Sequence, residues 1–153
     1  MTTLTEPLHR HHKHCDAMFA DAEVAVAAKD WALAAPLVMD FQQQLETHFR
    51  TEEEVLFPAF EATTGMAGGP TQMMRFEHAQ MRDLLDQMQL ALTGRVGDNF
   101  AGAAETLLIL MQQHNMKEEN ILYPMCDRSL ASQASTLGTA LTERLDAVCL
   151  KVN

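Results

Sequence analysis

The sequence has 153 residues, which suits one domain large enough to bury a hydrophobic core without disulfide or metal staples. A formal net charge of −10 argues against a nucleic-acid partner, because phosphate binding requires a concentrated cationic surface. No apolar run is long enough to span a bilayer and the N-terminus lacks the apolar core of a signal peptide, so we expect no membrane association and a cytoplasmic location.

Helices are expected along the whole chain, because glycine (7) and proline (5) are few and no alternating β-branched run competes. Apolar residues at helical spacing predict helices at about residues 8–28, 31–60, 70–92, 100–124 and 137–150. Asp30 is a suitable N-cap for the second helix, and Asp98 or Asn99 for the fourth. The segment TTGMAGGP at 63–70 is the clearest turn, and two of the longer helices lie on each side of it.

These elements predict an all-α fold, an antiparallel up-down four-helix bundle with a short extra C-terminal helix. A single domain would cover residues 1–153, with the bundle at about 8–128 and a C-terminal helical extension at about 131–150. The three cysteines, Cys15, Cys126 and Cys149, are widely spaced and form no CxxC pair, so neither a disulfide framework nor a zinc ribbon is indicated.

An internal repeat is the most informative feature of the sequence. HFRTEEEVLFP at 48–58 and HNMKEENILYP at 114–124 share the pattern H-x-x-x-E-E-x-x-L-aromatic-P, with an offset of 66 residues. The same offset relates His78, on the third helix, to His12 on the first, and so selects His12 from its neighbours His9, His11 and His14. Each half of the chain therefore contributes two histidines and one glutamate at matching positions.

The spacing within each half predicts a buried metal site. Residues i and i+4 of a helix point the same way, so His48 and Glu52 face one cavity, as do His114 and Glu118. A single pair of this kind is typical of an exposed helix surface, but here apolar residues flank both pairs, and a buried carboxylate without a cation is costly. Four imidazoles and two carboxylates are more ligands than one tetrahedral zinc ion binds, but they are enough for two five- or six-coordinate metal ions. Iron is the metal that fits this mixed nitrogen and oxygen ligand set best.

The chain resembles the bacterial hemerythrin-like proteins, which contain the histidine-histidine-glutamate cation-binding domain. The resemblance covers about residues 8–128 and rests on HRHHKHCDAMF, HFRTEEEVLFPAFE, FEHAQMRDLL and HNMKEENILYP. It implies two iron ions with an oxo or hydroxo bridge and reversible binding of O2 or another small diatomic such as NO. The implied metal ligands are His12 and His48 on one iron, His78 and His114 on the other, with Glu52 and Glu118 bridging.

Several neighbouring residues leave alternatives open. His14 could replace His12, and Glu119 could replace Glu118, because oxygen carriers place this carboxylate five residues after the histidine. We expect His9 and His11 to be frayed surface residues at the N-terminus. The remaining acidic residues of the two motifs, Glu53, Glu54 and Glu119, are expected to be solvated or to accept hydrogen bonds from imidazole N–H groups.

Three further residues carry specific expectations. Oxygen-carrying hemerythrins have an additional histidine four residues after the helix-three histidine, where this chain has Arg82. We expect Arg82 to pair with Asp16, its counterpart in the first half, because a guanidinium stays charged and cannot ligate a metal. Tyr123 is expected to pack in the core, with a possible hydrogen bond to the site.

The resemblance favours binding of O2 or NO for storage, sensing or buffering, without turnover. An alternative is a di-iron enzyme that reduces NO, peroxide or O2, or an iron donor for iron-sulfur cluster repair. Repair proteins of this type carry an additional cysteine-bearing N-terminal region, whereas here the first helix is expected within a few residues of Met1. A third hypothesis is a non-catalytic bundle that holds zinc or no metal and binds a partner through its acidic surface.

Overall fold

The computed structural model describes residues 3–152, with side chains described as far as Ala147. Cys149 therefore lies outside the described side chains. The regular structure of this range is entirely helical. The elements are α1 (Glu6–Ala27), α2 (Trp31–Thr51), η1 (Glu52–Leu56), α3 (Phe57–Thr64), α4 (Pro70–Thr93), α5 (Gly97–Lys117), η2 (Glu118–Leu122), α6 (Tyr123–Ser129), η3 (Ala131–Gln133) and α7 (Ala134–Val152).

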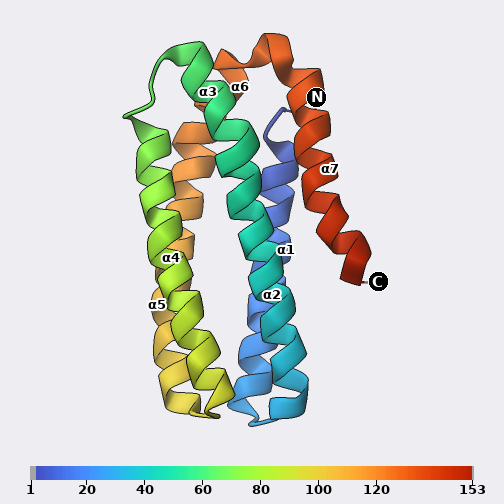
Figure 1. The fold of residues 1–153 in the computed structure, drawn as a ribbon, viewed down its shortest axis with the longest axis vertical. Coiled ribbons are helices and arrows are strands. Elements are labelled where there is room, and N and C mark those ends of the chain that lie inside the picture. Colours follow the sequence, from blue (N-terminus) through green and yellow to red (C-terminus); the bar gives the residue numbers. More distant parts are fainter. Residues whose placement is uncertain (1–2, 153) are drawn as a thin grey trace.

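Four long antiparallel rods form the bundle (Figure 1). Helix α2 continues through η1 into α3, and α5 continues through η2 into α6. The largest contacts join α1 to α2 and α4 to α5, while contacts of α1 with α5 and of α2 with α4 close the bundle. The predicted all-α, up-down four-helix bundle is confirmed, and the expected extra helix is α7, which runs back along α1 and α2.

The helix ends follow local sequence signals in most places. The Asp30 side chain accepts a hydrogen bond from the Leu33 backbone N–H at 3.2 Å, so this predicted N-cap is confirmed. Gly65 ends α3 in the left-handed conformation (φ 72°), which glycine adopts at little cost. The expected caps of α5 were wrong, because that helix begins earlier, with Val96 as its N-cap residue. Asp98 lies instead in the first turn of α5, where its negative charge interacts favourably with the positive end of the helix dipole.

Two π-helical turns, η1 and η2, interrupt the second and fourth rods, and the sequence analysis did not predict them. In both turns a backbone N–H bonds to the carbonyl five residues earlier, from Phe57 to Glu52 and from Tyr123 to Glu118. A proline lies two residues after the last residue of each turn, at Pro58 and Pro124, and proline lacks an N–H and crowds the preceding turn of a regular helix. The widened turns accommodate these prolines, and they begin at the two glutamates of the repeat.

The buried apolar side chains form two clusters along the bundle. On α1, Leu8 belongs to one cluster and Cys15 to the other, while the buried His12 lies between them. The same order recurs for His78 on α4, for His114 and Glu118 on the fourth rod and for Glu52 on the second, while His48 lies one turn from Glu52 at the edge of the cluster that contains Cys15. The core is therefore divided by a layer of buried polar side chains, which must be compensated by partners or by a cation.

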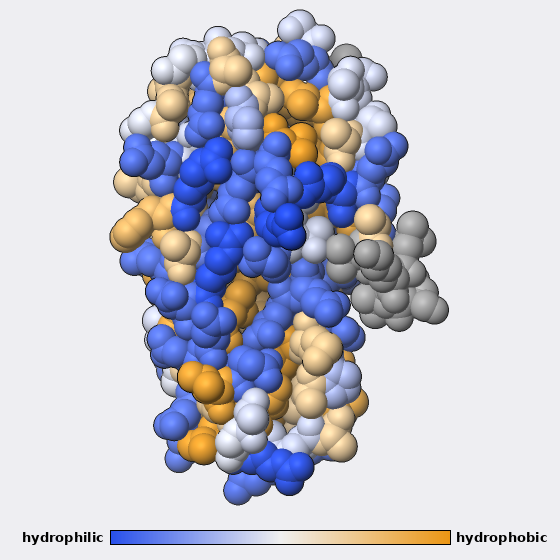
Figure 2. All heavy atoms as spheres, in the orientation of Figure 1, coloured by the Kyte–Doolittle hydropathy of each residue, from blue (hydrophilic) through white to orange (hydrophobic). Residues whose placement is uncertain are grey.

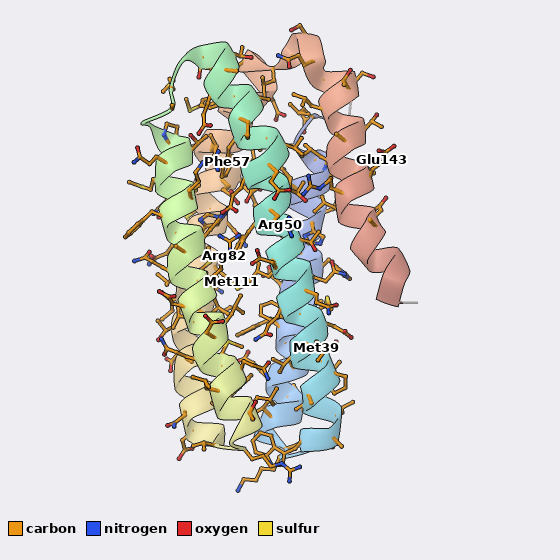
Figure 3. All side chains as sticks on the ribbon, viewed as in Figure 1. Met39, Arg50, Phe57, Arg82, Met111 and Glu143 are labelled. Carbon is orange, nitrogen blue, oxygen red and sulfur yellow. The ribbon has the colours of Figure 1, made fainter. Side chains whose placement is uncertain are left out.

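The outer surface is largely polar. Figure 2 shows hydrophilic side chains over most of the face formed by α2, α4 and α7, with apolar side chains between them. In Figure 3, Met111 points into the bundle, where it is buried, whereas Met39 lies on the exposed side of α2. Among the described residues, no helix is long and apolar enough to cross a membrane.

Candidate metal centre

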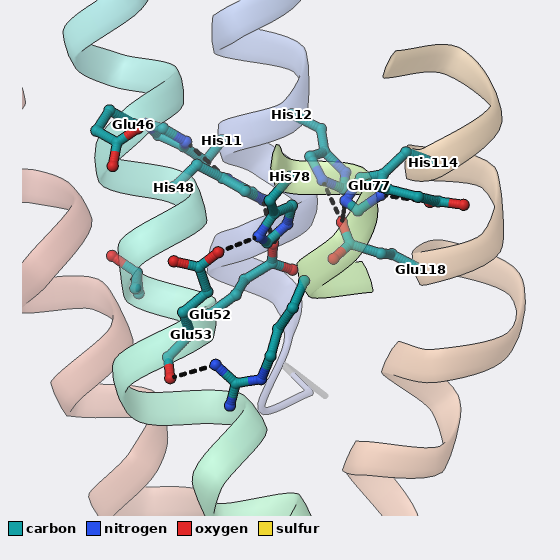
Figure 4. A network of polar contacts seen from close by, with 12 residues as sticks. His11, His12, Glu46, His48, Glu52, Glu53, Glu77, His78, His114 and Glu118 are labelled. Carbon is teal, nitrogen blue, oxygen red and sulfur yellow. Dashed lines mark hydrogen bonds and ion pairs between the residues drawn. The ribbon is translucent and has the colours of Figure 1, made fainter. Parts of the chain in front are cut away.

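Four histidines and two glutamates from four different rods meet in the polar layer (Figure 4). They are His12 from α1, His48 from α2, Glu52 from η1, His78 from α4, His114 from α5 and Glu118 from η2. All six are at most 4% exposed. The structure therefore brings together the six residues that the repeat selected.

The six side chains form two overlapping groups of donor atoms. His12, His48 and Glu118 offer one donor atom each within 4.8 Å of one another, and so do Glu52, His78, His114 and Glu118. Glu118 belongs to both groups. Glu52 Oε1 lies 3.2 Å from His78 Nε2 and 3.6 Å from His48 Nε2, so this carboxylate also lies between the two histidine pairs.

With the ring protons of the histidines on Nδ1, four inward-facing atoms of the centre lack a hydrogen-bond partner. They are Glu52 Oε1, Glu118 Oε2, His78 Nε2 and His114 Nε2. A buried polar atom without a partner costs about 1–3 kcal/mol, so four of them around one point would be a substantial penalty. Imidazole nitrogen and carboxylate oxygen are common metal-ligand atoms, and a cation at this point would satisfy all four. The donor set therefore fits a metal ion.

Hydrogen bonds on the outer side of the rings orient three of the imidazoles. The Nδ1–H of His12 donates to Glu119 at 2.6 Å, that of His78 to Glu53 at 2.8 Å, and that of His114 to Glu77 at 2.8 Å. A carboxylate in this place fixes the proton on Nδ1 and directs Nε2 toward the centre, as in many metal-bound histidines. The expected role of Glu53 and Glu119 as acceptors is confirmed, while Glu77 was missed.

The fourth imidazole, His48, is oriented by a histidine. Its Nδ1 lies 2.9 Å from His11 Nδ1, and His11 Nε2 lies 2.8 Å from Gln44 Oε1. Because an amide oxygen only accepts, His11 carries its proton on Nε2 and accepts the Nδ1–H of His48. The expectation that His11 is a frayed surface residue was wrong, since it is 5% exposed. The chain is already helical from Glu6, and α7 packs against α1.

The repeat contained the signal that would have identified His11 and Glu77. The offset of 66 residues that relates His48 to His114 also relates His11 to Glu77. The His12–Glu119 and His78–Glu53 hydrogen bonds obey the same relation. The outer contacts thus follow the same pseudo-twofold pattern as the inner six residues.

The rival candidates lie away from the centre. His14 is exposed, and His9 is half-buried with its Nδ1 4.0 Å from Glu119 Oε1. Glu119 faces the outer nitrogen of His12, with the buried Glu118 on the inner side. Glu54 pairs with Arg50 and Arg144 on the exposed surface.

Arg82 does not pair with Asp16, so this prediction was wrong. Its guanidinium binds Glu46 through contacts of 2.9 and 3.0 Å and Glu53 through contacts of 3.0 and 2.9 Å. Helix α4 packs on α2 and α5, whereas α1 packs on α2, α5 and α7, so α4 and α1 lie diagonally across the bundle. Arg82 therefore reaches α2 and η1, where it braces the carboxylate that holds His78.

Tyr123 is buried in the core as expected, and it also makes a hydrogen bond to the site, for which it was only a minor candidate. Its fully buried hydroxyl donates to Glu52 Oε2 at 2.7 Å and lies 3.1 Å from Glu118 Oε1. It also lies 3.4 Å from both His12 Nε2 and His48 Nε2. The tyrosine is thus in contact with one histidine pair and both glutamates.

The protonation of the centre also indicates a place for a cation. Burial, followed by the charge of Glu118, raises the pKa of Glu52 to about 7. Burial would lower the pKa of His114, but its contacts with Glu118 and Glu77 raise it to about 10, and His12 is raised to about 9 in the same way by Glu118 and Glu119. Without a metal, protons on His12 and His114 therefore balance the buried carboxylates, and a metal ion would replace these protons on binding.

Fold and site together define a helical bundle with a cation-binding centre of histidine and glutamate. The chain belongs to the hemerythrin family: the family model described as "Hemerythrin HHE cation binding domain" matches residues 3–126. It is 25% identical over 136 residues to an uncharacterized hemerythrin-like protein of Schizosaccharomyces pombe, covering 88% of this chain and 64% of that protein. It is 30% identical over 93 residues to the iron-sulfur cluster repair protein YtfE of Edwardsiella ictaluri, covering 54% of this chain and 42% of that protein. No solved structure matched the chain significantly.

Proposed function

We propose that the chain is a non-haem di-iron protein that binds O2, or another small diatomic such as NO, for storage, sensing or buffering. The two iron ions would be held by His12, His48, His78 and His114, with Glu52 and Glu118 as bridges. The observation that carries this proposal is that two buried glutamates lie between the two histidine pairs: Glu118 belongs to both groups of donor atoms, and Glu52 Oε1 lies 3.6 Å from His48 Nε2 and 3.2 Å from His78 Nε2. One carboxylate can hold two ions through its two oxygens, so this arrangement suits a metal pair better than a single ion.

The surrounding residues prepare the centre for such a pair. Outer hydrogen bonds keep the four Nε2 atoms directed inward before any ion arrives. The ring of Phe49 stacks on His78 with centroids 4.2 Å apart, and the buried Met81 and Met111 belong to the adjoining apolar cluster. These residues exclude water from one side of the centre and form an apolar environment suited to a small uncharged ligand. When bound, the iron pair would supply the electrons and the exchangeable coordination position that a diatomic gas requires.

Anaerobic reconstitution tests the proposal. Metal-free protein is loaded with ferrous iron, and the visible spectrum is followed during titration with O2 and, separately, with NO. The proposal predicts uptake of about two iron ions per chain and a reversible spectral change with one or both gases. One tightly bound zinc ion with no uptake of iron would contradict it.

A second candidate is delivery of iron to damaged iron-sulfur clusters, or reduction of NO, peroxide or O2 at the same centre. The observation that favours repair is the similarity to the protein named iron-sulfur cluster repair protein YtfE. The chain spans less than half of that protein's length, so its activity is here a hypothesis only. Incubating the iron-loaded protein with a cluster-depleted iron-sulfur protein under anaerobic conditions distinguishes the two functions: cluster recovery supports repair, whereas retention of both ions supports binding.

A cytoplasmic location belongs to the same proposal. Cys126 is buried and has a free thiol in the described structure, which suits a reducing compartment. Fractionation of the producing cells, with detection of the untagged chain, tests this location directly.

A further inference from the structure

Tyr123 distinguishes the two halves of the centre. The residue 66 positions earlier is Phe57, and both rings are fully buried at the end of a π-helical turn. Tyr123 stacks on His12 with centroids 5.7 Å apart and an interplanar angle of 15°, and Phe57 stacks on His78 at 5.9 Å and 19°. The two rings thus occupy equivalent positions, and they differ in one hydroxyl group.

That hydroxyl divides the inward-facing donor atoms into two sets of four. The first set lies around the Tyr123 hydroxyl and contains Glu52 Oε2 (2.7 Å), Glu118 Oε1 (3.1 Å), His12 Nε2 (3.4 Å) and His48 Nε2 (3.4 Å). The second set contains the other oxygens of the two glutamates with His78 Nε2 and His114 Nε2, and its members have no hydrogen-bond partner. Each glutamate therefore gives one oxygen to each set, and only one set includes a phenol.

We infer, on the basis of the proposed di-iron function, that Tyr123 is a fifth protein ligand of the iron held by His12 and His48. Phe57 offers no such donor to the iron held by His78 and His114, which keeps an open position where the diatomic ligand binds. The two irons would then differ although the sequence halves that hold them are related.

The distances carry this assignment. Divalent zinc holds nitrogen and oxygen donors at about 2.0–2.2 Å, which places neighbouring donors of a six-coordinate ion of similar size about 3 Å apart. The Tyr123 hydroxyl lies 2.7–3.4 Å from the four atoms of its set, so it takes the place of a neighbouring donor. An ion bound to His12, His48 and Glu118 has this oxygen as a further donor within reach. On coordination an O–metal bond replaces the O–H bond, and the proton passes to the buffer, as for other metal-bound acids.

The chain contains a single tyrosine, so any phenolate signal from the loaded protein comes from Tyr123. Untagged wild type and Tyr123→Phe are loaded anaerobically with ferrous iron alone and then oxidised in air. Iron per chain, the visible spectrum and resonance Raman scattering are measured. We expect the ferric wild type to show a phenolate-to-iron charge-transfer band with enhanced phenolate ring vibrations. The Tyr123→Phe variant should bind two irons and lack both features.

The matched control exchanges the two rings. In the double variant Phe57→Tyr/Tyr123→Phe the hydroxyl moves to the other half, and the phenolate features should return. The single variant Phe57→Tyr should keep both irons but lose NO binding in the ferrous state, because the open position is then filled, while Tyr123→Phe should retain it.

The outcomes distinguish failure of the ligand assignment for Tyr123 from failure of the proposed di-iron function. A wild type with two ferric ions and no phenolate vibrations overturns the ligand assignment and leaves the proposed function standing. A charge-transfer band that persists in Tyr123→Phe does the same. If Tyr123→Phe fails to fold, the wild-type Raman spectrum decides alone, because it can contain only one phenolate. A wild type that binds no iron pair overturns the proposed function and this inference together.

Discussion

Residue by residue, the outer contacts of the imidazoles are the part of the site that is most open to test. His11 accepts the Nδ1–H of His48, the same role that Glu77 has for His114. His11→Leu removes this acceptor and frees His48 to turn, so we expect iron affinity to fall by about 10-fold, in the range typical for outer partners of metal ligands. Equilibrium dialysis against ferrous iron measures the effect.

Two variants serve as controls for His11. The exposed His14→Leu should leave iron binding unchanged. His11→Glu restores an acceptor of the kind found at Glu77, so it should retain most of the affinity. Equal losses in His11→Leu and His11→Glu would show that His11 acts by packing and not through its hydrogen bond.

If Glu52 and Glu118 bridge the two ions as proposed, loss of either carboxylate should affect the whole centre. Glu52→Gln or Glu118→Gln removes an oxygen charge shared by both histidine pairs, so each should reduce the content of both ions and not of one. Elemental analysis after iron loading gives the count. Glu119→Gln changes only the outer partner of His12 and should have a smaller effect. Full iron occupancy in the first two variants would show that the bridges lie elsewhere.

Glu53 predicts a pH dependence of stability for the metal-free protein. Burial opposes its ionisation, but hydrogen bonds from His78 and Arg82 lower its pKa to about 2 from the model-peptide value of 4.5. A lowered carboxyl pKa stabilises the fold above the unfolded-state value, and this contribution is lost as the pH falls from about 4.5 to about 2. Glu53→Gln should therefore be less stable than wild type in urea at pH 7, with the difference shrinking toward pH 2. A difference that does not change with pH would contradict this account.

At the scale of the elements, α7 is part of the hydrophobic core and not only an extension on the surface. Leu141 and Leu145 are buried in the cluster that also contains Leu8, so α7 completes the upper part of the core. Leu141→Ala should destabilise the protein by about 2–5 kcal/mol, as for other buried leucines. Urea unfolding measures this value. Leu90, which is 75% exposed, provides the control, and Leu90→Ala should change stability by less than about 0.5 kcal/mol.

The helices were predictable from the sequence because helical spacing and turn residues specify them locally. The segments at about residues 31–60 and 100–124 correspond to the second and fourth rods, although both rods extend further. The π-helical turns were not predictable in the same way, because one additional residue in a turn leaves the apolar spacing on each side intact. Pro58 and Pro124 were the available signal, since proline inside a helix demands a local adjustment.

The partners of single side chains were harder to predict than the helices. The error at Arg82 arose because equivalent positions in a repeat were assumed to be neighbours, whereas α1 and α4 lie diagonally across the bundle. The error at His11 arose because a position near the N-terminus was assumed to be frayed. The packing of α7 over α1 is a long-range contact that the periodicity of α1 does not reveal.

Over the whole molecule, two related halves enclose one polar layer. The repeat supplies matching histidines and glutamates, and the fold places them at one level between two apolar clusters. The halves differ at two pairs of equivalent positions: His11 in the first half corresponds to Glu77 in the second, and Phe57 corresponds to Tyr123. The symmetric residues would hold the proposed pair of ions, and these two differences would give the two ions inequivalent environments.

The central claim is that this layer holds two metal ions. Its most direct test is an anaerobic titration of the metal-free wild type with ferrous iron, with free and bound iron measured at each step. The account predicts tight uptake that ends at about two ions per chain. An end point of one ion per chain would contradict it, because the shared glutamates would then serve a single site.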